Sequence, residues 1–468
     1  MNQLILALYS TLMWCAQPFL RRKLARRGRA EPGYLAHMEE RFGYYTSNAQ
    51  SAAQHPAPDQ RFVWVHAVSL GETRVAGVLI DALRKRIPDM RLLLTHGTAT
   101  GRDQGQRLLR AGDVQVWQAW DTPAAVRRFT AHFKPRIGIL METELWPNMA
   151  VTCANQGIPL VMANARLSEK TYASTSTFAW LARPAYQSLT AVWAQSEADA
   201  QRFEALGASV QGVLGNIKFD ACVDAVQLTQ GRAWRAKLGR PVLIFASSRD
   251  GEELQLLTYL KKNKSNIPLA GVNVDYDAIK NILNSENQVP QTDRQVQWLI
   301  VPRHPQRFDQ VADLIRAQGF KVSRRSEWPP EGPDSGGSAN TQSGQTTQTI
   351  WLGDSLGEMA LYYGLSDAAL LGGSFEPLGG QNLIEAAACG CPVLMGPSTF
   401  NFAEAAQLAV QAGAALQLDS LPQAVQAAKT LLETRGALNA SRTAAMAFAA
   451  AHQGAADKTA AAILALLR

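Results

Sequence analysis

The alternation of short apolar runs with helix-like stretches is the feature that most limits the fold of this chain. A first series begins with the apolar run at residues 62–67, passes through a helical stretch to about residue 86, and resumes at residues 91–95. It continues with apolar runs at residues 137–141, 160–163 and 191–194. Strand-like runs that alternate with helical patterns are typical of parallel βαβ units.

A second series of the same kind follows in the second half of the chain. Its apolar runs lie at residues 242–246, 298–301, 349–352, 368–371 and 393–395. The two series predict two doubly wound α/β domains that face each other, joined by a linker near residues 221–240. A length of 468 residues is enough for two large domains.

Two stretches interrupt the rhythm of the second series. Residues 261–295 and 327–348 are polar and poor in apolar side chains, which predicts insertions or mobile loops, and we assign neither a chemical role. The alanine-rich tail, from about residue 438 to residue 468, predicts a helix that packs back across the domain boundary.

The N-terminal segment has the composition of a membrane-associated helix. Residues 4–20 are mostly apolar, with Tyr9 and Trp14 as interfacial aromatics, and the basic residues 21–27 follow at once. The run is at the short limit for a bilayer span and contains Gln17 and Pro18. Because the charges follow the apolar run, we expect an uncleaved anchor or an interfacial helix, with the bulk of the chain in the cytoplasm. A soluble helix packed on the catalytic body is the alternative.

Charge and cysteine content limit the partners. The net charge of +7 is concentrated near the N-terminus, and no zinc-ligand spacing, heptad-linked basic region or ribonucleoprotein signature accompanies it. A membrane surface or an acidic substrate therefore fits better than nucleic acid. The five scattered cysteines argue against a disulfide framework and for a reducing compartment, and they form no metal-binding cluster.

A glycine-rich loop at residues 372–380 leads into a helix that ends at Gly390. Glycines let backbone N–H groups approach an anion at the start of the following helix, and phosphate is the expected guest. Asn382 and Glu385 share one face of the first turn, where the carboxylate can accept hydrogen bonds from ribose hydroxyls. This pattern predicts a nucleotide pocket, with a tightly packed strand-to-helix turn as the alternative.

Charged side chains follow the strand-like runs of the first series. Glu72 begins a helix after the run at residues 62–67, as a general base or as a partner of the helix dipole. Glu142 and Glu144 follow the run at residues 137–141, and the cost of burying both predicts that at least one faces the cleft or an arginine. Arg166 and Lys218 follow later runs and suit an anionic ligand.

The second series carries a similar cationic pair. Arg303 and His304 follow the run at residues 298–301, where they form either a site for phosphate or carboxylate or an ordinary surface pair.

Taken together, these motifs resemble the bacterial 3-deoxy-D-manno-octulosonic acid (Kdo) transferases of lipopolysaccharide synthesis. They lie, in the family's order and spacing, at residues 66–73, 141–148, 164–168, 215–220, 302–307, 353–358, 372–385 and 393–403. The sequences Met-Glu-Thr-Glu-Leu-Trp-Pro-Asn, at residues 141–148, and Gly-Pro-Ser-Thr-Phe-Asn-Phe, at residues 396–402, are the most specific. The resemblance extends over almost the whole chain.

The resemblance implies a GT-B fold, with two Rossmann-like domains and a cleft between them. It implies inverting transfer of Kdo from CMP-Kdo to the 6′-hydroxyl of a lipid A precursor, lipid IVA, without a metal or another cofactor. The implied parts are a membrane anchor or interfacial helix (1–30), an acceptor domain (31–225), a nucleotide-sugar domain (240–435) and a C-terminal helix packing back (436–468). The implied partners are CMP-Kdo, the lipid A precursor and the cytoplasmic leaflet of the inner membrane, and nucleic acid is not among them.

The resemblance also implies roles for single residues. Glu72 corresponds to the general base, and Glu142 and Glu144 to acceptor-side or base-orienting carboxylates. The implied CMP site consists of Arg303, His304, Gly353, Ser374, Gly380, Asn382 and Glu385. Possible anion contacts are Ser69, Arg166 and Lys218. The chain departs from the family at Arg249 and Gln381, where histidine is usual, so no histidine can be invoked there.

Two other hypotheses remain open at this point. A different GT-B enzyme of the envelope, such as a lipid-disaccharide synthase or a nucleotide-sugar epimerase, would share the glycine-rich loop but not residues 141–148. An inactive membrane-bound sugar-nucleotide binder would keep Asn382 and Glu385 and could dispense with Glu72. The presence of both sets favours an active transferase.

Overall fold

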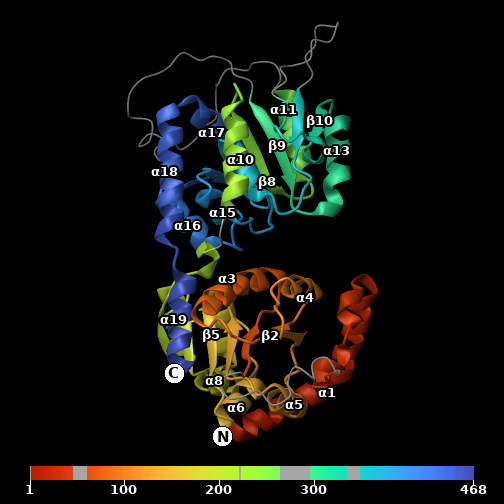
Figure 1. Ribbon diagram of the computed structural model, residues 1–468, viewed down its shortest axis with the longest axis vertical. Helices are drawn as coiled ribbons and strands as arrows, with labels where there is room; N and C mark the ends of the chain where they lie inside the picture. The colour runs from red at the N-terminus through yellow and green to blue at the C-terminus, as the bar shows by residue number, and fades with distance from the viewer. Residues whose placement is uncertain (1, 46–60, 221–222, 264–295, 335–347, 468) are drawn as a thin grey trace. The chain divides into compact units, whose positions relative to one another are not determined.

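The computed structural model describes residues 2–45, 61–220, 223–263, 296–334 and 348–467 (Figure 1). The chain forms two compact units, one made of Met1–Ala221 with His452–Arg468 and the other of Cys222–Ala451. Most of the two expected insertions, residues 264–295 and 335–347, lies outside the described residues.

The first unit is built on a sheet of seven strands in the order β3-β2-β1-β4-β5-β6-β7. All of its strand pairs are parallel. The strands are β1 (Val63–His66), β2 (Leu92–His96), β3 (Val114–Trp117), β4 (Ile137–Met141), β5 (Leu160–Ala165), β6 (Ala191–Ala194) and β7 (Val210–Val213). The chain winds outward from β1 to β3 and then returns to β4 on the other side of β1, so the winding direction reverses between β1 and β4.

Helices cover both faces of this sheet, and two apolar cores result. In β1, Trp64 packs into one core with Phe129, while Val63 and Val65 pack into the other with Leu79. Burial on both faces explains why the central strands read as continuous apolar runs. The covering helices are α3 (Leu70–Arg86), α4 (Ala99–Gln106), α5 (Pro123–Phe133), α6 (Pro147–Asn155), α7 (Glu169–Thr177), α8 (Ala179–Gln187) and α9 (Glu197–Ala205).

The C-terminal helix α19 (Ala455–Leu467) belongs to the first unit and packs beside α3 (Figure 1). Its N-terminus is capped by the carboxylate of Asp220, which accepts hydrogen bonds from the backbone N–H groups of Gly454 and Ala456. Ile463 is completely buried in the core that also contains Leu79. The last helix therefore closes one face of the first sheet.

Helix α1 (Asn2–Ala30) contacts α6 and α8 of the first unit. The hydroxyl of Tyr9 hydrogen-bonds to the buried carboxylate of Asp121, and the hydroxyl of Ser10 donates to Oδ1 of Asn148 at 2.9 Å. Among the described residues, no helix is long and apolar enough to cross a membrane.

The second unit repeats the doubly wound arrangement with seven parallel strands in the order β10-β11-β9-β8-β12-β13-β14. The strands are β8 (Val242–Ser248), β9 (Gln297–Pro302), β10 (Lys321–Arg324), β11 (Thr349–Leu352), β12 (Ala368–Leu371), β13 (Val393–Met395) and β14 (Ala415–Gln417). Here the winding direction reverses between β8 and β12.

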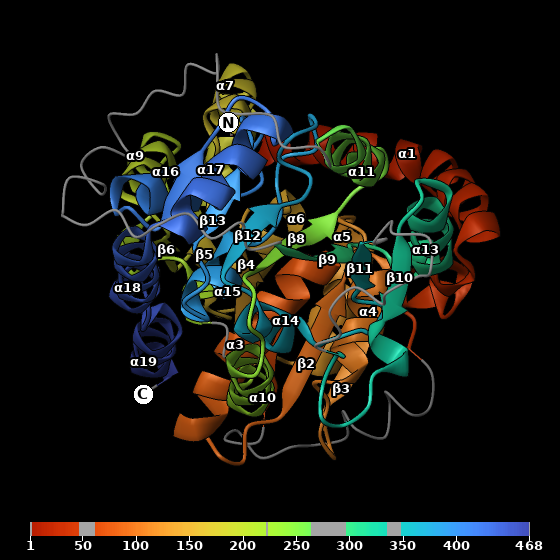
Figure 2. The ribbon, with the colours of Figure 1, turned by 90° about the horizontal axis from the view of Figure 1, so that it is seen from above.

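The helices of the second unit are α10 (Ala225–Ala236), α11 (Glu252–Lys262), α13 (Phe308–Ala317), α14 (Met359–Leu365), α15 (Leu383–Ala388), α16 (Ala403–Gln411), α17 (Leu421–Glu433) and α18 (Arg435–Ala451) (Figure 2). Residues 225–236, near the expected boundary, form α10 and pack against α14. The two helices can approach closely because Gly231 has no side chain: a Cβ atom there would lie 2.2 Å from the carbonyl oxygen of Leu361. The predicted fold class, two doubly wound α/β domains of the GT-B type, is confirmed.

We expect Ile463→Ala to destabilise the first unit by about 2–4 kcal/mol, because the substitution leaves a cavity in a closed core. The free energy of unfolding is measured by urea titration with circular dichroism. Leu466→Ala on the same helix is the matched control, since Leu466 is 39% exposed and its truncation leaves no buried cavity. Equal effects of the two substitutions would contradict the placement of α19.

Candidate functional site

Polar side chains of the first unit gather where the winding direction of its sheet reverses. His66, at the end of β1, lies in register with Leu140 of β4, so the segments that follow the two strands leave the sheet side by side. Ligands of open α/β sheets bind at this edge, beyond the carboxyl ends of the strands. Glu72 follows β1 and Glu142 and Glu144 follow β4, which brings these three predicted residues to the same edge.

Glu72 lies in the first turn of α3 and takes part in a capping box. Its two carboxylate oxygens accept hydrogen bonds from the backbone N–H of Val68, at 2.9 Å, and the hydroxyl of Ser69, at 3.1 Å. Ser69 in turn caps the helix by accepting from the N–H of Glu72. Burial raises the pKa of Glu72, and the negative charge of Glu142 adds to the shift, while these hydrogen bonds oppose it. Glu72 therefore has a structural role and a raised proton affinity together.

Glu142 and Glu144 have different surroundings although they are two residues apart. Glu142 has a left-handed backbone, with φ of 61°, and one of its oxygens forms an ion pair with Nζ of Lys218 at 3.0 Å. Oε2 of Glu144 accepts a hydrogen bond from the indole N–H of Trp146 at 3.2 Å, and the Glu144 side chain is 41% exposed. Glu142 is thus a neutralised, largely buried carboxylate, and Glu144 is the open one.

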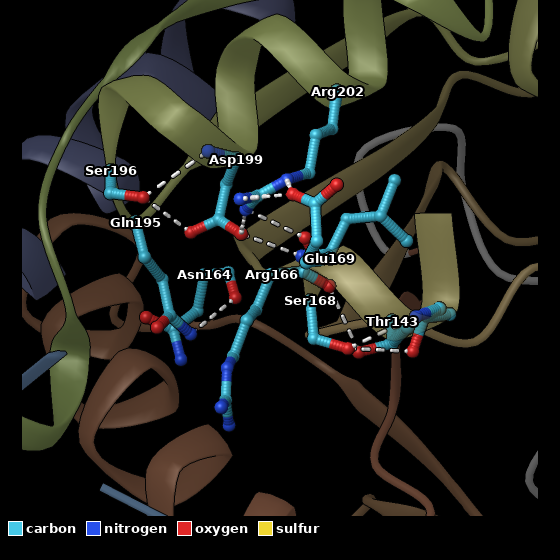
Figure 3. A network of polar contacts seen from close by, with 11 residues as sticks. Thr143, Asn164, Arg166, Ser168, Glu169, Gln195, Ser196, Asp199 and Arg202 are labelled. Carbon is cyan, nitrogen blue, oxygen red and sulfur yellow. Dashed lines mark hydrogen bonds and ion pairs between the residues drawn. The ribbon is translucent and has the colours of Figure 1, made fainter. Parts of the chain in front are cut away.

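The predicted anion contact Arg166 directly follows β5 and lies next to a network of polar contacts around α9 (Figure 3). In this network Asp199 accepts from the N–H of Leu167 at 2.7 Å, and Arg202 pairs with Glu169 at 2.9 Å. The side chain of Arg166 extends away from the network in Figure 3, and within the part of the chain that is described its guanidinium has no hydrogen-bond or ion-pair partner. The network thus fixes the backbone around Arg166, whose guanidinium can bind an anionic ligand.

In the second unit, the glycine-rich loop follows β12, next to the point where the winding direction reverses. The N–H of Gly373 donates to both carboxylate oxygens of Glu252, at 2.9 and 2.8 Å, and the N–H of Arg249 donates to the same carboxylate at 2.8 Å. Glu252 is fully buried, and burial raises its pKa against the effect of these hydrogen bonds. A carboxylate of the chain itself therefore occupies the beginning of the loop.

Ser374 does not face a ligand. Its side chain is fully buried, its hydroxyl donates to the carbonyl oxygen of Leu371, and the same oxygen accepts from the N–H of Gly396 at 2.8 Å. The hydroxyl thus joins β12 to the segment after β13. We therefore leave Ser374 out of the donor site that its motif implied.

The later part of the loop carries the other predicted residues. Gly380 has φ of 70°, a left-handed conformation that favours glycine, and its N–H donates to the carbonyl oxygen of Gly373 at 2.8 Å. Oδ1 of Asn382 accepts from the N–H of Ile384 at 3.0 Å and so caps α15. Glu385 lies half-buried in the first turn of that helix.

Cationic side chains surround this later part of the loop. Nε of Arg303 donates to Oε1 of Gln381 at 3.1 Å. Partial burial lowers the pKa of His304, and the nearby guanidinium groups of Arg249, Arg303 and Arg307 lower it further. Three guanidinium groups therefore lie near His304 after β8 and β9, and that of Arg307 is paired with Glu253 at 2.9 Å and with Asp250 at 3.0 Å.

Gly353, which follows β11, is explained by packing. A Cβ atom at this position would lie 2.7 Å from Cγ2 of Val301 and 2.9 Å from Cζ of Tyr362.

Two residues of these sites were not assigned a role from the sequence. Glu252 has no predicted role, and its contact with Gly373, 121 positions later, shows that it holds the loop. His66 was included in the motif around Glu72 without a function of its own. No group of three or more His, Cys, Asp or Glu residues that could hold a metal ion occurs among the described residues.

The comparisons with known proteins agree with one another. A family model described as "3-Deoxy-D-manno-octulosonic-acid transferase (kdotransferase)" matches residues 36–221. The chain is 40% identical to the 3-deoxy-D-manno-octulosonic acid transferase of Bordetella pertussis, over 88% of this chain and 88% of that protein. It is 30% identical to the enzyme of the same name from Haemophilus influenzae, over 91% of this chain and 90% of that protein.

Two solved structures show a similar fold. A glycosyltransferase from Rickettsia africae matches with a TM-score of 0.50 and 12% identity, over 87% of this chain and 98% of that one. An Anabaena protein in complex with UDP matches with a TM-score of 0.50 and 13% identity, over 87% of this chain and 100% of that one. At this level of identity the likeness concerns the fold.

Proposed function

Since the chain belongs to the 3-deoxy-D-manno-octulosonic acid (Kdo) transferase family, we propose that it transfers Kdo from CMP-Kdo to the 6′-hydroxyl of a lipid A precursor. Its general activity, Kdo transfer in lipopolysaccharide core synthesis, follows from the family. The observation that carries the finer proposal is the group of carboxylates at the reversal point of the first sheet, beside Lys218 and Arg166, whose guanidinium has no partner among the described residues. A hydroxyl acceptor that carries negative charge needs a base and cations together.

On the acceptor side, we assign Glu72 as the general base. The acceptor oxygen attacks the anomeric carbon of Kdo, the bond from that carbon to the phosphate oxygen breaks, and CMP leaves with the electron pair. The acceptor proton passes to Glu72, whose raised pKa makes it a stronger base than an exposed carboxylate. Lys218 fixes Glu142 next to this base, and Arg166 binds the Kdo carboxylate or an acceptor phosphate.

On the donor side, cations and the glycine-rich loop bind the nucleotide. Arg303 and His304 lie beside the loop, where positive charge stabilises the phosphate of departing CMP. Gly380 lets the backbone approach the ligand, Asn382 holds the start of α15, and Glu385 accepts hydrogen bonds from the ribose hydroxyls.

Helix α1 supports a place at the cytoplasmic face of the inner membrane. Leu4, Leu8, Leu12 and Phe19 are 79%, 63%, 64% and 76% exposed and recur at helical spacing along one side. Tyr9 and Ser10, on the other side, bind the helix to the unit, and the basic residues 21–27 follow. We infer that α1 lies in the interface of an anionic leaflet, where the acylated acceptor is also found.

The transfer itself is tested with purified protein, CMP-Kdo and a tetraacyl lipid A precursor, without added metal and with a chelator present. We expect a lipid product heavier by one or more Kdo units in mass spectrometry. An unchanged lipid, with CMP still bound by the protein, would reject the proposed acceptor.

Glu72→Gln should lower kcat about 10²- to 10⁴-fold and leave the affinity for CMP unchanged, because the amide keeps an acceptor for the cap but takes up no proton. In the wild type, only ionised Glu72 accepts the proton. The rate should therefore fall as the pH falls through a midpoint above the ordinary glutamate pKa of 4.5. Glu197→Gln, at an exposed glutamate of α9, is the control. Full turnover by Glu72→Gln would exclude this base.

Glu385→Ala should raise the Kd for CMP about tenfold, because it removes a charged acceptor for the ribose hydroxyls. Isothermal titration calorimetry measures the change, and the exposed Glu433→Ala in the same unit is the control. Undiminished affinity in Glu385→Ala would contradict the assigned contact.

The double variant Leu8→Glu, Leu12→Glu should bind vesicles of phosphatidylglycerol and phosphatidylethanolamine about 10- to 100-fold more weakly, because two exposed apolar side chains become anionic. Vesicle co-sedimentation gives the affinities. Leu254→Glu, at a leucine of the second unit that is 44% exposed, should bind as the wild type does. Equal binding by the double variant would remove α1 from the interface.

A further inference from the structure

We propose that His66 is a positioning residue for the transfer reaction. As a neutral imidazole, fixed as the Nε2–H tautomer, it holds one carboxylate oxygen of Glu144 and leaves the other open to the acceptor. The reaction that it serves rests on the proposed function, while its tautomer and its contact with Glu144 are properties of the folded protein.

His66 is the last residue of β1 and is only 1% exposed. Its Nε2 atom is buried and makes no hydrogen bond with any described residue. The same atom lies 3.6 Å from Oε2 of Glu144, beyond ordinary hydrogen-bond length but directly opposite a carboxylate. Because an unpaired buried nitrogen is costly, its direction toward an open carboxylate requires an explanation.

The tautomer of His66 follows from its other ring nitrogen. Nδ1 lies 2.9 Å from Oγ1 of Thr95, and Nε1 of Trp64 lies 2.8 Å from the same oxygen. An indole nitrogen only donates, so Thr95 accepts from Trp64 and has its own proton left to give. Among the described residues Nδ1 of His66 is the partner that can take this proton. The hydrogen of neutral His66 then lies on Nε2, facing Glu144.

The opposite tautomer is disfavoured on both sides of the ring. It would place a bare Nε2 lone pair against the carboxylate of Glu144 and leave the hydroxyl proton of Thr95 without an acceptor. A doubly protonated ring would conflict with the same hydroxyl proton. The relay from Trp64 through Thr95 therefore keeps His66 neutral with Nε2–H outward.

This arrangement gives Glu144 two unequal oxygens. Oε2 faces two ring N–H groups, that of Trp146 at 3.2 Å and that of His66 at 3.6 Å. Oε1 has no hydrogen-bond or ion-pair partner within the described part of the chain, and the side chain is 41% exposed. By contrast, both oxygens of Glu72 already accept hydrogen bonds in its capping box. Oε1 of Glu144 therefore has fewer partners than either carboxylate oxygen of Glu72, and it is the oxygen that can contact an incoming hydroxyl.

A neutral His66 also preserves the charge that the site needs. The ionisable groups around it are Glu72 of α3, His96 of β2, Glu142 and Glu144 after β4, and Lys218. Burial lowers the pKa of His96 to about 4, so His96 carries no charge at neutral pH. Lys218 already neutralises Glu142, and a further cation at His66 would weaken the base at Glu72.

Two substitutions of His66 distinguish the role of Nδ1 from the role of Nε2. Asparagine retains a group near Nδ1 for Thr95 and lacks the Nε2–H, whereas glutamine carries an N–H close to the Nε2 position. We expect His66→Asn to lower kcat about 30- to 100-fold, as misplacement of a reacting group does, with the KM for CMP-Kdo within twofold. The kcat of His66→Gln should stay within about fivefold of the wild-type value.

Thr95 tests the relay. Thr95→Val should lower kcat about tenfold and Thr95→Ser should restore it. Thr130→Val is the matched control, since Thr130 is another buried threonine of this unit and its hydroxyl donates to the backbone oxygens of Val126 and Arg127 in its own helix. Circular dichroism checks that every variant is folded.

A readout without turnover completes the test. In ¹⁵N-histidine NMR spectra at pH 7, the signal that is missing from His66→Asn should show a neutral ring with its proton on Nε2, and Thr95→Val should shift it toward a mixture of tautomers. An Nδ1–H or doubly protonated ring, or equal kcat in the asparagine and glutamine variants, would overturn the proposal. If the wild type transfers no Kdo, the proposed acceptor fails while the NMR result still decides the tautomer.

Discussion

The burial of both faces of each parallel sheet is the constraint on which the rest of this structure depends. Parallel strands require crossovers, and the crossover helices shield the sheet from water on both sides. Since the strands also end at one edge, polar side chains have few other places to converge. Glu72 and Glu144 in one unit, and the glycine-rich loop in the other, lie where the winding direction reverses. The position of the chemistry follows from how the sheets are covered.

The same constraint explains which strands could be predicted from the sequence. The ten apolar runs correspond to the inner strands of the two sheets, which are buried on both faces. The four strands without a predicted run, β3, β7, β10 and β14, are the four edge strands. Their sequences, such as Lys321–Arg324, contain polar residues because one side is not covered by a neighbour. The apolar pattern thus predicts the class of fold but does not predict the edge strands of the sheets.

For the site residues, too, local features could be predicted from the sequence, whereas contacts between residues far apart in the chain could not. The carboxylates after β1 and β4 could be placed at a sheet edge because a strand end is a local feature. The neighbours of Ser374 could not, since its buried hydroxyl bonds to Gly396, 22 positions later. The loop that suggested phosphate also bonds to Glu252, 121 positions earlier. A motif shows which residues are present, and only the folded chain shows which hydrogen-bonding groups are already occupied.

The burial of α19 has a consequence for synthesis. Residues 452–468 follow the whole second unit in the chain, yet Ala460 and Ile463 complete a core of the first unit. A nascent chain therefore has all strands of the first sheet outside the ribosome long before it has the helix that closes one face of that sheet. During this interval the apolar surface that α19 later covers is open, and it attracts chaperones or other exposed apolar segments. The unit that is translated first is thus the last to be finished.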